Sequence, residues 1–367
     1  MTEQELSAYI QAIRPADEAA MEAARRRQAQ LAKPPGSLGQ LEEISIRLAG
    51  VTGQVCPAMD NCRVAVFAAD NGVVAEGVSC TPPAVTLQQA VNMTFRKTGM
   101  SAMAAAFGDD VSVVDVGIDG DVPPVGVLDR KVRRGTGDIA REDAMTRQQV
   151  LDAMAAGMEQ AARARADGVT ALGIGEMGIG NTTTSAAVLA ALTGADIEAV
   201  TGRGGGLTDE GFLRKKEVLR QALALHRPDG SDVIGVLAGV GGLDLAAMTG
   251  AFLGCAHERV PAAVDGFISI AAALCAVRLC PAVRDVLFLS HDSYEVGYRI
   301  AAEALGLQPC LRLGMRLGEG SGCPLLFRVL EGACGVMRGM ATFGEASIED
   351  SYLDEIRAVD AFTVEGA

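Results

Sequence analysis

The sequence predicts an α/β protein built on a mostly parallel, doubly wound sheet. Short, continuously apolar runs recur along the chain, and Ala-rich stretches with helical spacing lie between them. Glycine-rich or polar motifs follow directly after several of these runs. Continuously apolar strands separated by helices are typical of parallel sheets that are covered on both faces. Because ligands bind at the carboxyl ends of the strands in such folds, the motifs predict a binding site at that edge.

The predicted elements begin with helices over the first 55 residues, which a turn at residues 33–39 interrupts. Candidate strands follow at residues 63–69, 111–117, 169–175, 233–239, 286–290 and 310–313. Between the third and fourth strands, residues 183–193 have helical spacing. The apolar run 260–282 contains charged residues, Gly and Pro, which indicates a buried helix rather than a membrane span.

Composition and charge exclude several classes of partner. The 367 residues are 49% hydrophobic and 21% charged, which is an ordinary globular balance. With 32 basic and 46 acidic residues the net charge is −14, and such a surface repels nucleic acid and anionic membranes. A phosphorylated ligand must therefore be held by backbone N–H groups and a few well-placed cations. The first 15 residues lack the apolar segment of a signal peptide, so we expect a cytoplasmic protein.

The cysteines and histidines predict no metal site. The nine cysteines include no Cys-x-x-Cys pair, which in a cytoplasmic protein indicates reduced, mostly buried thiols. The three histidines lie far apart in the sequence. Contiguous His291, Asp292 and Ser293 cannot fold onto each other as a catalytic triad, so we interpret His291 as a structural residue.

The first candidate binding motif follows the third predicted strand, at residues 173–184. Its glycines lead into Asn181 and three threonines that open an Ala-rich helix, an arrangement typical of a phosphate site. Gly173, Gly175 and Gly178 also match the dinucleotide fingerprint G-x-G-x-x-G. A further alternative is that the glycines serve only close packing of strand and helix, with Thr as the helix cap.

Three other segments contain candidate site residues. The glycine-rich loop 201–209 precedes Lys215 and Lys216, either of which composition alone predicts to be a solvated helix lysine. Glu319 lies between glycines after the last predicted strand, where a carboxylate can act as a general base or remain exposed and inert. Ser79 and Gln88 follow the first strand, where they can contact the nitrogens of a planar heterocycle or cap a helix.

Eight segments together resemble the nicotinate-nucleotide:dimethylbenzimidazole phosphoribosyltransferase family. They are collinear between residue 33 and about residue 342, and their order and spacing make the resemblance specific. The segments are KPPGSLGQLE, AADNGVVAEGVS, VTLQQ, GIGEMGIGNTTTSAA, GLTDEGFLRKK, VLAGVGGLDL, VDGFISIAAAL and GMRLGEGSG.

The resemblance implies a Rossmann-like large domain over residues 56–324 and a small helical domain formed by both chain ends, residues 1–55 and 325–367. It also implies a homodimer. Glu319 matches the family's catalytic glutamate, and Glu176 matches an acidic residue near the reacting ribose. The residues that match the nucleotide and phosphate site are Gly178, Gly180, Asn181, Thr182, Thr183, Gly204 and Lys215. Those that match the base pocket are Ser79, Gln88, Met315 and Leu317.

The implied reaction transfers the phosphoribosyl group of nicotinate mononucleotide to a benzimidazole-like base, without a metal or cofactor. Departures from the family pattern at Cys80, Val296, Tyr298, Arg312 and Cys323 leave open whether the base is a benzimidazole, a purine or a phenol. One alternative function is an NAD(P)-dependent dehydrogenase that uses the glycine fingerprint. Another is a nucleotide-binding regulator without catalysis.

Overall fold

The computed structural model describes residues 1–354 and contains one sheet of six parallel strands. The strand order is β3-β2-β1-β4-β5-β6, so the chain reverses direction across the sheet between β1 and β4. The strands are β1 (Cys62–Ala69), β2 (Asp110–Gly117), β3 (Val127–Asp129), β4 (Ala171–Met177), β5 (Ala262–Val264) and β6 (Leu287–Leu289). The predicted α/β fold with a parallel sheet is confirmed.

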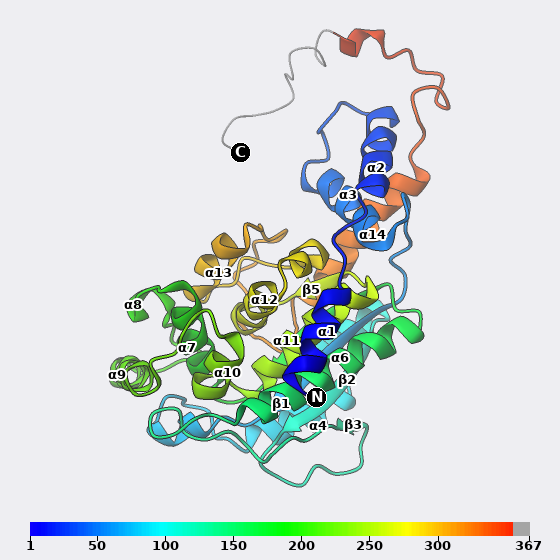
Figure 1. Cartoon of the computed structure of the whole chain (residues 1–367). Coiled ribbons are helices and arrows are strands. Elements are labelled where there is room, and N and C mark those ends of the chain that lie inside the picture. The colour runs from blue at the N-terminus through cyan, green and yellow to red at the C-terminus, as the bar shows by residue number, and fades with distance from the viewer. Residues whose placement is uncertain (355–367) are drawn as a thin grey trace.

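Helices cover both faces of the sheet (Figure 1). One face is covered by α4 (Val85–Thr94), α5 (Gly99–Phe107) and α14 (Cys323–Gly339). The other is covered by α6 (Arg147–Ala166), α11 (Leu243–Glu258) and α12 (Phe267–Leu279). Beside α12 lie α7 (Asn181–Thr193), α10 (Val233–Val240) and α13 (Gly297–Leu305). Helices α8 (Ile197–Val200) and α9 (Asp209–His226) pack against α7.

The two long helices α6 and α11 pack with almost no side chain between their backbones. A Cβ atom at Gly157 would lie 1.8 Å from the carbonyl oxygen of Ala247, and one at Gly250 would lie 2.0 Å from that of Met154. Glycine is therefore required at both positions, because any side chain would push the helices apart. This contact fixes α11, whose amino-terminal end reaches the cavity region described below.

The helices of the amino-terminal segment pack in two places. Helix α1 (Glu3–Ala12) lies along the main body, where the Met1 ammonium group pairs with Asp152 at 3.0 Å. Helices α2 (Glu18–Gln30) and α3 (Gln40–Thr52) pack with α14 as a separate lobe at the top of Figure 1. The apolar centre of this lobe consists of Ala20, Ala24, Leu31, Ala49 and Met337. The predicted domain boundaries stay a prediction, and residues 355–367 of the predicted small domain lie outside the described residues.

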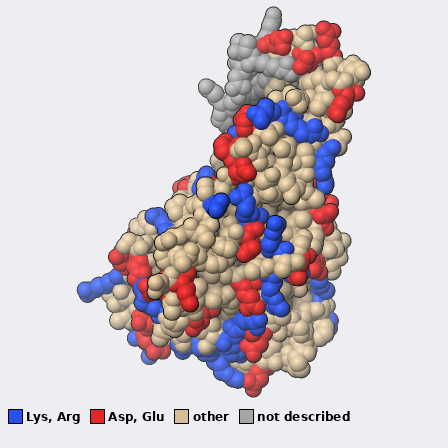
Figure 2. Space-filling view, turned by 45° about the vertical axis from the view of Figure 1, so that its right-hand side comes forward, with Lys and Arg blue, Asp and Glu red and all other residues tan. Residues whose placement is uncertain are grey.

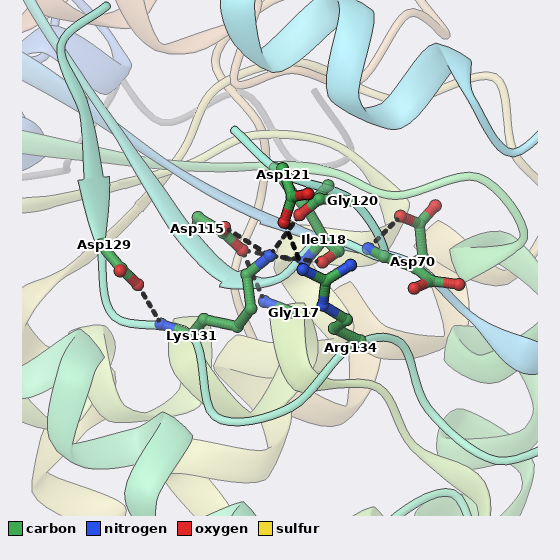
Figure 3. A network of polar contacts seen from close by, with 10 residues as sticks. Asp70, Asp115, Gly117, Ile118, Gly120, Asp121, Asp129, Lys131 and Arg134 are labelled. Carbon is green, nitrogen blue, oxygen red and sulfur yellow. Dashed lines mark hydrogen bonds and ion pairs between the residues drawn. The ribbon is translucent and has the colours of Figure 1, made fainter. Parts of the chain in front are cut away.

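An ion pair between the buried Asp115 and the partly exposed Lys131 fixes the loop that follows β2 (Figure 3). The carboxylate of Asp115 accepts hydrogen bonds from the backbone N–H groups of Gly117 and Ile118 and pairs with Lys131 Nζ at 3.1 Å. Lys131 also donates to the carbonyl oxygens of Ile118 and Gly120, both at 2.7 Å. Every hydrogen of this ammonium group thus has a partner, so the network is structural and holds the loop beside the end of β1.

The surface carries charges of both signs. On the face shown in Figure 2, acidic and basic side chains are interspersed over both the sheet domain and the upper lobe. Within residues 1–354 the structure contains no helix with the length and apolar character needed to cross a bilayer. All nine cysteines are free thiols, and six of them are buried, as predicted.

The strand predictions at residues 63–69, 111–117, 169–175 and 286–290 are confirmed to within about two residues. The prediction at residues 233–239 is wrong, because this segment is helix α10, capped by the side chain of Asp232 on the N–H of Gly235. A short, wholly apolar run is compatible with a buried helix or a buried strand, and here the cap decides for the helix.

Two further predictions need correction. Residues 310–313 do not form a strand, since only Leu311 makes a single bridge, to His291. The run 260–282 is not one helix, because β5 precedes α12 and the two meet at Asp265 and Gly266. The short strand β3 was not predicted, because three residues give too weak a pattern.

Candidate active site

A cavity of about 240 Å³ opens at the carboxyl edge of the sheet. The loops that follow β1, β4, β5 and β6 contribute to its wall, together with the turn that precedes α14. This is the point where the strand order reverses, and ligands of open α/β sheets bind there. The segments that contribute most of the wall are residues 78–81, 176–182, 203–207, 265–269 and 316–319.

Glu176 is the first of two buried acids at the cavity. It lies near the end of β4, and its Oε2 atom accepts a hydrogen bond from the side-chain amide of Asn181. Its Oε1 atom accepts from the backbone N–H of Glu319 at 3.3 Å. Burial raises the pKa of Glu176 from 4.5 to about 8, and the nearby carboxyl of Asp244 adds to the rise.

Glu319 is the second acid, and its backbone adopts a conformation that side chains rarely take. Its φ angle is 64°, between Gly318 at 82° and Gly320 at 83°. A non-glycine residue in this region carries strain, and such strain is often found at functional sites. The Oε2 atom accepts from the N–H of Met100 at the start of α5, at 3.2 Å. Burial raises the pKa of Glu319, and the hydrogen bond from Met100 partly opposes this.

The turn that carries Glu319 is held in place by backbone contacts. The carboxylate of Asp265 accepts from the N–H groups of Gly320 at 3.0 Å and Gly322 at 2.7 Å. A Cβ atom on Gly175 of strand β4 would lie 2.6 Å from both the Cα and the N atom of Gly320. Only glycine at position 175 permits this approach, and the approach is what brings Glu319 beside Glu176.

The predicted phosphate loop lies at the amino-terminal end of helix α7. Gly178, Gly180, Asn181 and Thr182 line the cavity, and Gly180 has a φ of 93°. Thr183 is fully buried beneath them, does not line the cavity, and its hydroxyl has no hydrogen-bond partner. The positive end of the helix dipole suits an anion at this position.

Lys215 is buried directly behind this loop. Its Nζ atom donates to the hydroxyl of Thr182 at 2.8 Å and would lie 3.7 Å from a Cβ atom on Gly204, and both of these partners line the cavity. Burial lowers the pKa of Lys215 to about 8, and Glu295 opposes that change. The expectation of a solvated lysine is therefore wrong for Lys215. Lys216 is only partly exposed, with 14% of its side chain accessible, and it pairs with the exposed Glu198.

The structure brings only part of the predicted base pocket to the cavity. Ser79 and Leu317 line it, but Gln88 is exposed and its neighbour Gln89 lines the wall instead. Met315 is half-buried and lies outside the wall. Of the two cysteines that flank the predicted pocket, Cys80 lines it. Cys323 is buried with its thiol donating to the carbonyl of Ala263.

The wall residues that sequence reasoning missed include the titratable Asp265, His291, Glu295 and Arg316. His291 is buried with Nδ1 3.0 Å from the hydroxyl of Ser290, in keeping with a structural role. In the sequence, Asp265 is one of the charged residues within the apolar run 260–282. The pattern that could have identified Asp265 is an Asp-Gly pair directly after a short apolar run. Asp70 and Asn71 form a similar polar pair directly after β1.

Comparison with known proteins assigns the family. Residues 13–348 match the family described as phosphoribosyltransferase. A nicotinate-nucleotide–dimethylbenzimidazole phosphoribosyltransferase of Clostridium perfringens is 46% identical over 341 residues, which cover 93% of this chain and 94% of the relative. The chain belongs to this phosphoribosyltransferase family. The enzyme of the same name from Geobacter metallireducens is 45% identical, over 94% of this chain and 98% of the relative.

A solved structure agrees with the family assignment. The nicotinate-nucleotide–dimethylbenzimidazole phosphoribosyltransferase of Thermus thermophilus superimposes with a TM-score of 0.87 at 44% identity, covering 91% of this chain and 100% of that structure. The dehydrogenase alternative gains no support. Gly173 and Gly175 lie inside strand β4 and pack against Cys323 and Gly320, rather than forming a loop after the strand.

The raised pKa of Glu176 predicts a pH-dependent stability. The folded protein keeps the proton of Glu176 up to about pH 8, whereas an exposed glutamate loses it near 4.5. The contribution of the Glu176 proton to the stability of the folded protein is therefore fully present below about pH 4.5. It is lost as the pH rises through about 8. The amide of Glu176→Gln does not titrate, so the melting temperature of this variant should rise relative to wild type between pH 5 and about 8.5.

Calorimetric melting across this pH range measures the effect, with Glu210→Gln as the control because Glu210 is exposed on α9. Equal pH trends for wild type and both variants would contradict the assignment of a buried, protonated Glu176.

Proposed function

We propose that this phosphoribosyltransferase transfers the phosphoribosyl group of nicotinate mononucleotide to 5,6-dimethylbenzimidazole or a similar base. The products are the α-ribotide and nicotinate, and the reaction serves assembly of the nucleotide loop of cobalamin and related cobamides. The observation that carries the proposal is the meeting of two buried acids, Glu176 and Glu319, at one cavity on the switch point of the sheet. The names of the relatives support the choice of substrates.

Glu319 acts as the general base in the proposed mechanism. A nitrogen of the incoming base attacks the anomeric carbon of the ribose, and the bond from that carbon to the pyridinium nitrogen breaks. Nicotinate leaves with a neutral ring, so no acid is needed to protonate it. The N–H group of the incoming base loses its proton to the Glu319 carboxylate, and burial makes this carboxylate a stronger base.

Glu176 stabilises the positive charge that develops on the ribose as the pyridinium bond breaks. A carboxylate beside an oxocarbenium-like centre lowers the barrier electrostatically, as in glycoside hydrolysis. Attack from the side opposite the leaving group inverts the anomeric carbon and converts the β-linked substrate to an α-linked product. This chemistry requires neither a metal nor a redox cofactor.

The phosphate of the mononucleotide is proposed to bind between helix α7 and the glycine loop that contains Gly204. Lys215 supplies the positive charge from behind, through the hydroxyl of Thr182. The net charge of −14 gives no attraction to a phosphate from a distance, so local donors of this kind must hold it. Ser79, Gln89 and Leu317 are proposed to contact the base. The homodimer implied by the resemblance stays a prediction.

Replacing Glu319 tests the proposed mechanism. The protein, nicotinate mononucleotide and 5,6-dimethylbenzimidazole are mixed, and nicotinate and the ribotide are followed by chromatography and mass spectrometry. Glu319→Gln should lower kcat by about 10²- to 10⁴-fold while the protein stays folded, because the amide cannot accept the proton. Wild-type turnover in a folded Glu319→Gln variant would exclude Glu319 as the base.

The neighbouring lysines Lys215 and Lys216 provide a matched pair for the phosphate site. Lys215→Met should raise KM for nicotinate mononucleotide by about tenfold to a hundredfold, the effect of losing one charge-assisted hydrogen bond. Lys216→Met should leave KM unchanged, because Lys216 pairs with Glu198 and does not line the cavity. Steady-state kinetics at saturating base measures both, and an equal effect of the two variants would contradict the placement of the phosphate.

A further inference from the structure

Asp244 lies behind the proposed active site and is bridged to Glu176 by a single amide. It is the second residue of α11 and is fully buried. The Nδ2 atom of Asn181 donates to Asp244 Oδ2 at 2.9 Å and also to Glu176 Oε2. Asp244 does not belong to the cavity wall, so any effect it has on the reaction passes through Asn181 and Glu176.

The hydrogen-bond donors around this acid pair are all neutral. Apart from the Asn181 amide, the donors are the backbone N–H groups of Glu319 to Glu176 and of Leu245 to Asp244. Among the described residues, no Lys, Arg or His forms an ion pair with either carboxyl. Two ionised carboxylates without a cation are strongly disfavoured in a buried position.

The charged groups that face the pair from neighbouring elements are themselves acids. Asp265 after β5 and Glu319 in the turn before α14 face Glu176, and Asp70 after β1 faces Asp244. Burial is the main cause that raises the pKa of Asp244, to about 6, and that of Glu176, to about 8. These shifts agree with the contacts, which provide no positive charge to keep either group ionised.

The side chain of Asn71 gives independent evidence that the surroundings of the acid pair contain too few hydrogen-bond donors. Its Oδ1 atom is buried and has no hydrogen-bond partner. A Cβ atom on Gly242 would lie 2.8 Å from this oxygen and 2.4 Å from Asp244 Oδ1, so both oxygens face the same point. The free site thus contains more acceptors than donors, and protons on the acids would relieve the deficit.

We propose that Asp244 is a positioning residue that acts on this reaction through Glu176. The two carboxyls form a buried acid pair that shares its protons, and the pair releases one proton when the pyridinium ring of the substrate binds. The proton leaves a carboxylic acid of the pair and passes to solvent buffer. The carboxylate that remains faces the cationic ring and later the developing charge on the ribose. This proposal rests on the proposed function, since it takes nicotinate mononucleotide as the ligand.

The physical reason is that the positive ring supplies the missing cation. Before binding, the pair keeps protons because ionisation has no compensation, and after binding the ionised form gains an opposite charge nearby. Binding therefore favours the deprotonated pair. The affinity should rise with pH up to the pKa that the pair has in the free enzyme, and then level off.

Isothermal titration calorimetry in two buffers of different ionisation enthalpy at pH 7 counts the released protons. Nicotinate mononucleotide is compared with ribose 5-phosphate, which has the same phosphate but no cationic ring. Wild type should release about one proton more per site with the mononucleotide. Asp244→Asn should lower this excess to less than about half, because removing the neighbouring acid lets Glu176 ionise before binding. Glu176→Gln should also lower it, because it removes one of the two acids.

Asp109→Asn is the matched control. Asp109 is a buried aspartate at the amino-terminal end of β2, and it pairs with Arg328. This variant should release as many protons as wild type. The dissociation constant of wild type should fall by up to about tenfold per pH unit between pH 6 and 8, and less steeply in Asp244→Asn. Thermal melting of each variant confirms that it is folded.

The outcomes separate this proposal from the proposed function. Failure of nicotinate mononucleotide to bind folded wild type would overturn the function itself. Binding without excess proton release, or an excess that both Asp244→Asn and Glu176→Gln leave unchanged, would overturn the role of the acid pair and leave the transferase intact.

Discussion

The active-site geometry depends on a contact between two pieces of backbone that have no side chain between them. Strand β4 presents Gly175 to Gly320, so closely that a single Cβ atom at Gly175 would overlap the turn before α14. Asp265 holds the other side of this turn through the N–H groups of Gly320 and Gly322. Glu319 is fixed between the two with a strained φ of 64°, and its own N–H group bonds to Glu176.

The proposed function requires a strongly acidic protein to bind a substrate that carries a phosphate, and the site offers a physical reason. In the proposed binding mode the phosphate lies at the helix α7 terminus, near one buried lysine, and both act only over a short distance. The ribose side instead gathers carboxyls without a cation, and this suits a ligand whose reacting ring is positive. The two ends of the cavity thus have opposite electrostatic character, which orients a zwitterionic mononucleotide.

Sequence reasoning found the residues whose position follows from the sheet. Glu176 lies at the end of a strand that is easy to recognise, and the predicted phosphate loop follows it directly. Glu319 lies in a run of glycines that is hard to explain by packing. It failed where tertiary contacts decide. Helix α10 is as apolar as a buried strand, and its cap is one aspartate. The burial of Lys215 depends on packing between α9 and α7, which no local pattern reveals.

The acids Asp265, in the cavity wall, and Asp244, behind it, were the least predictable part. Asp265 follows a three-residue strand that lies inside a longer apolar run. Because the run continues past the strand, the pattern reveals neither the strand nor the point where it ends. Asp244 is separated from Glu176 by 68 positions along the chain, and only the amide of Asn181 brings the two together. Such a bridge forms only because the amino-terminal ends of α7 and α11 meet at the same edge of the sheet. This meeting can be recognised only from the complete fold.

The most direct test of the account is the turnover of Gly175→Ala, measured together with its binding of ribose 5-phosphate. The added Cβ must displace the turn that carries Glu319, because the three atoms nearest to it all belong to Glu319 and Gly320 of that turn. The account predicts a folded protein that binds the sugar phosphate normally and turns over about a hundredfold more slowly, since a displacement of about 1 Å can cost that much. Gly332→Ala, at an exposed glycine of α14 with no atom near its Cβ position, should keep full activity. Full turnover in folded Gly175→Ala would contradict the claim that this backbone contact sets the catalytic geometry.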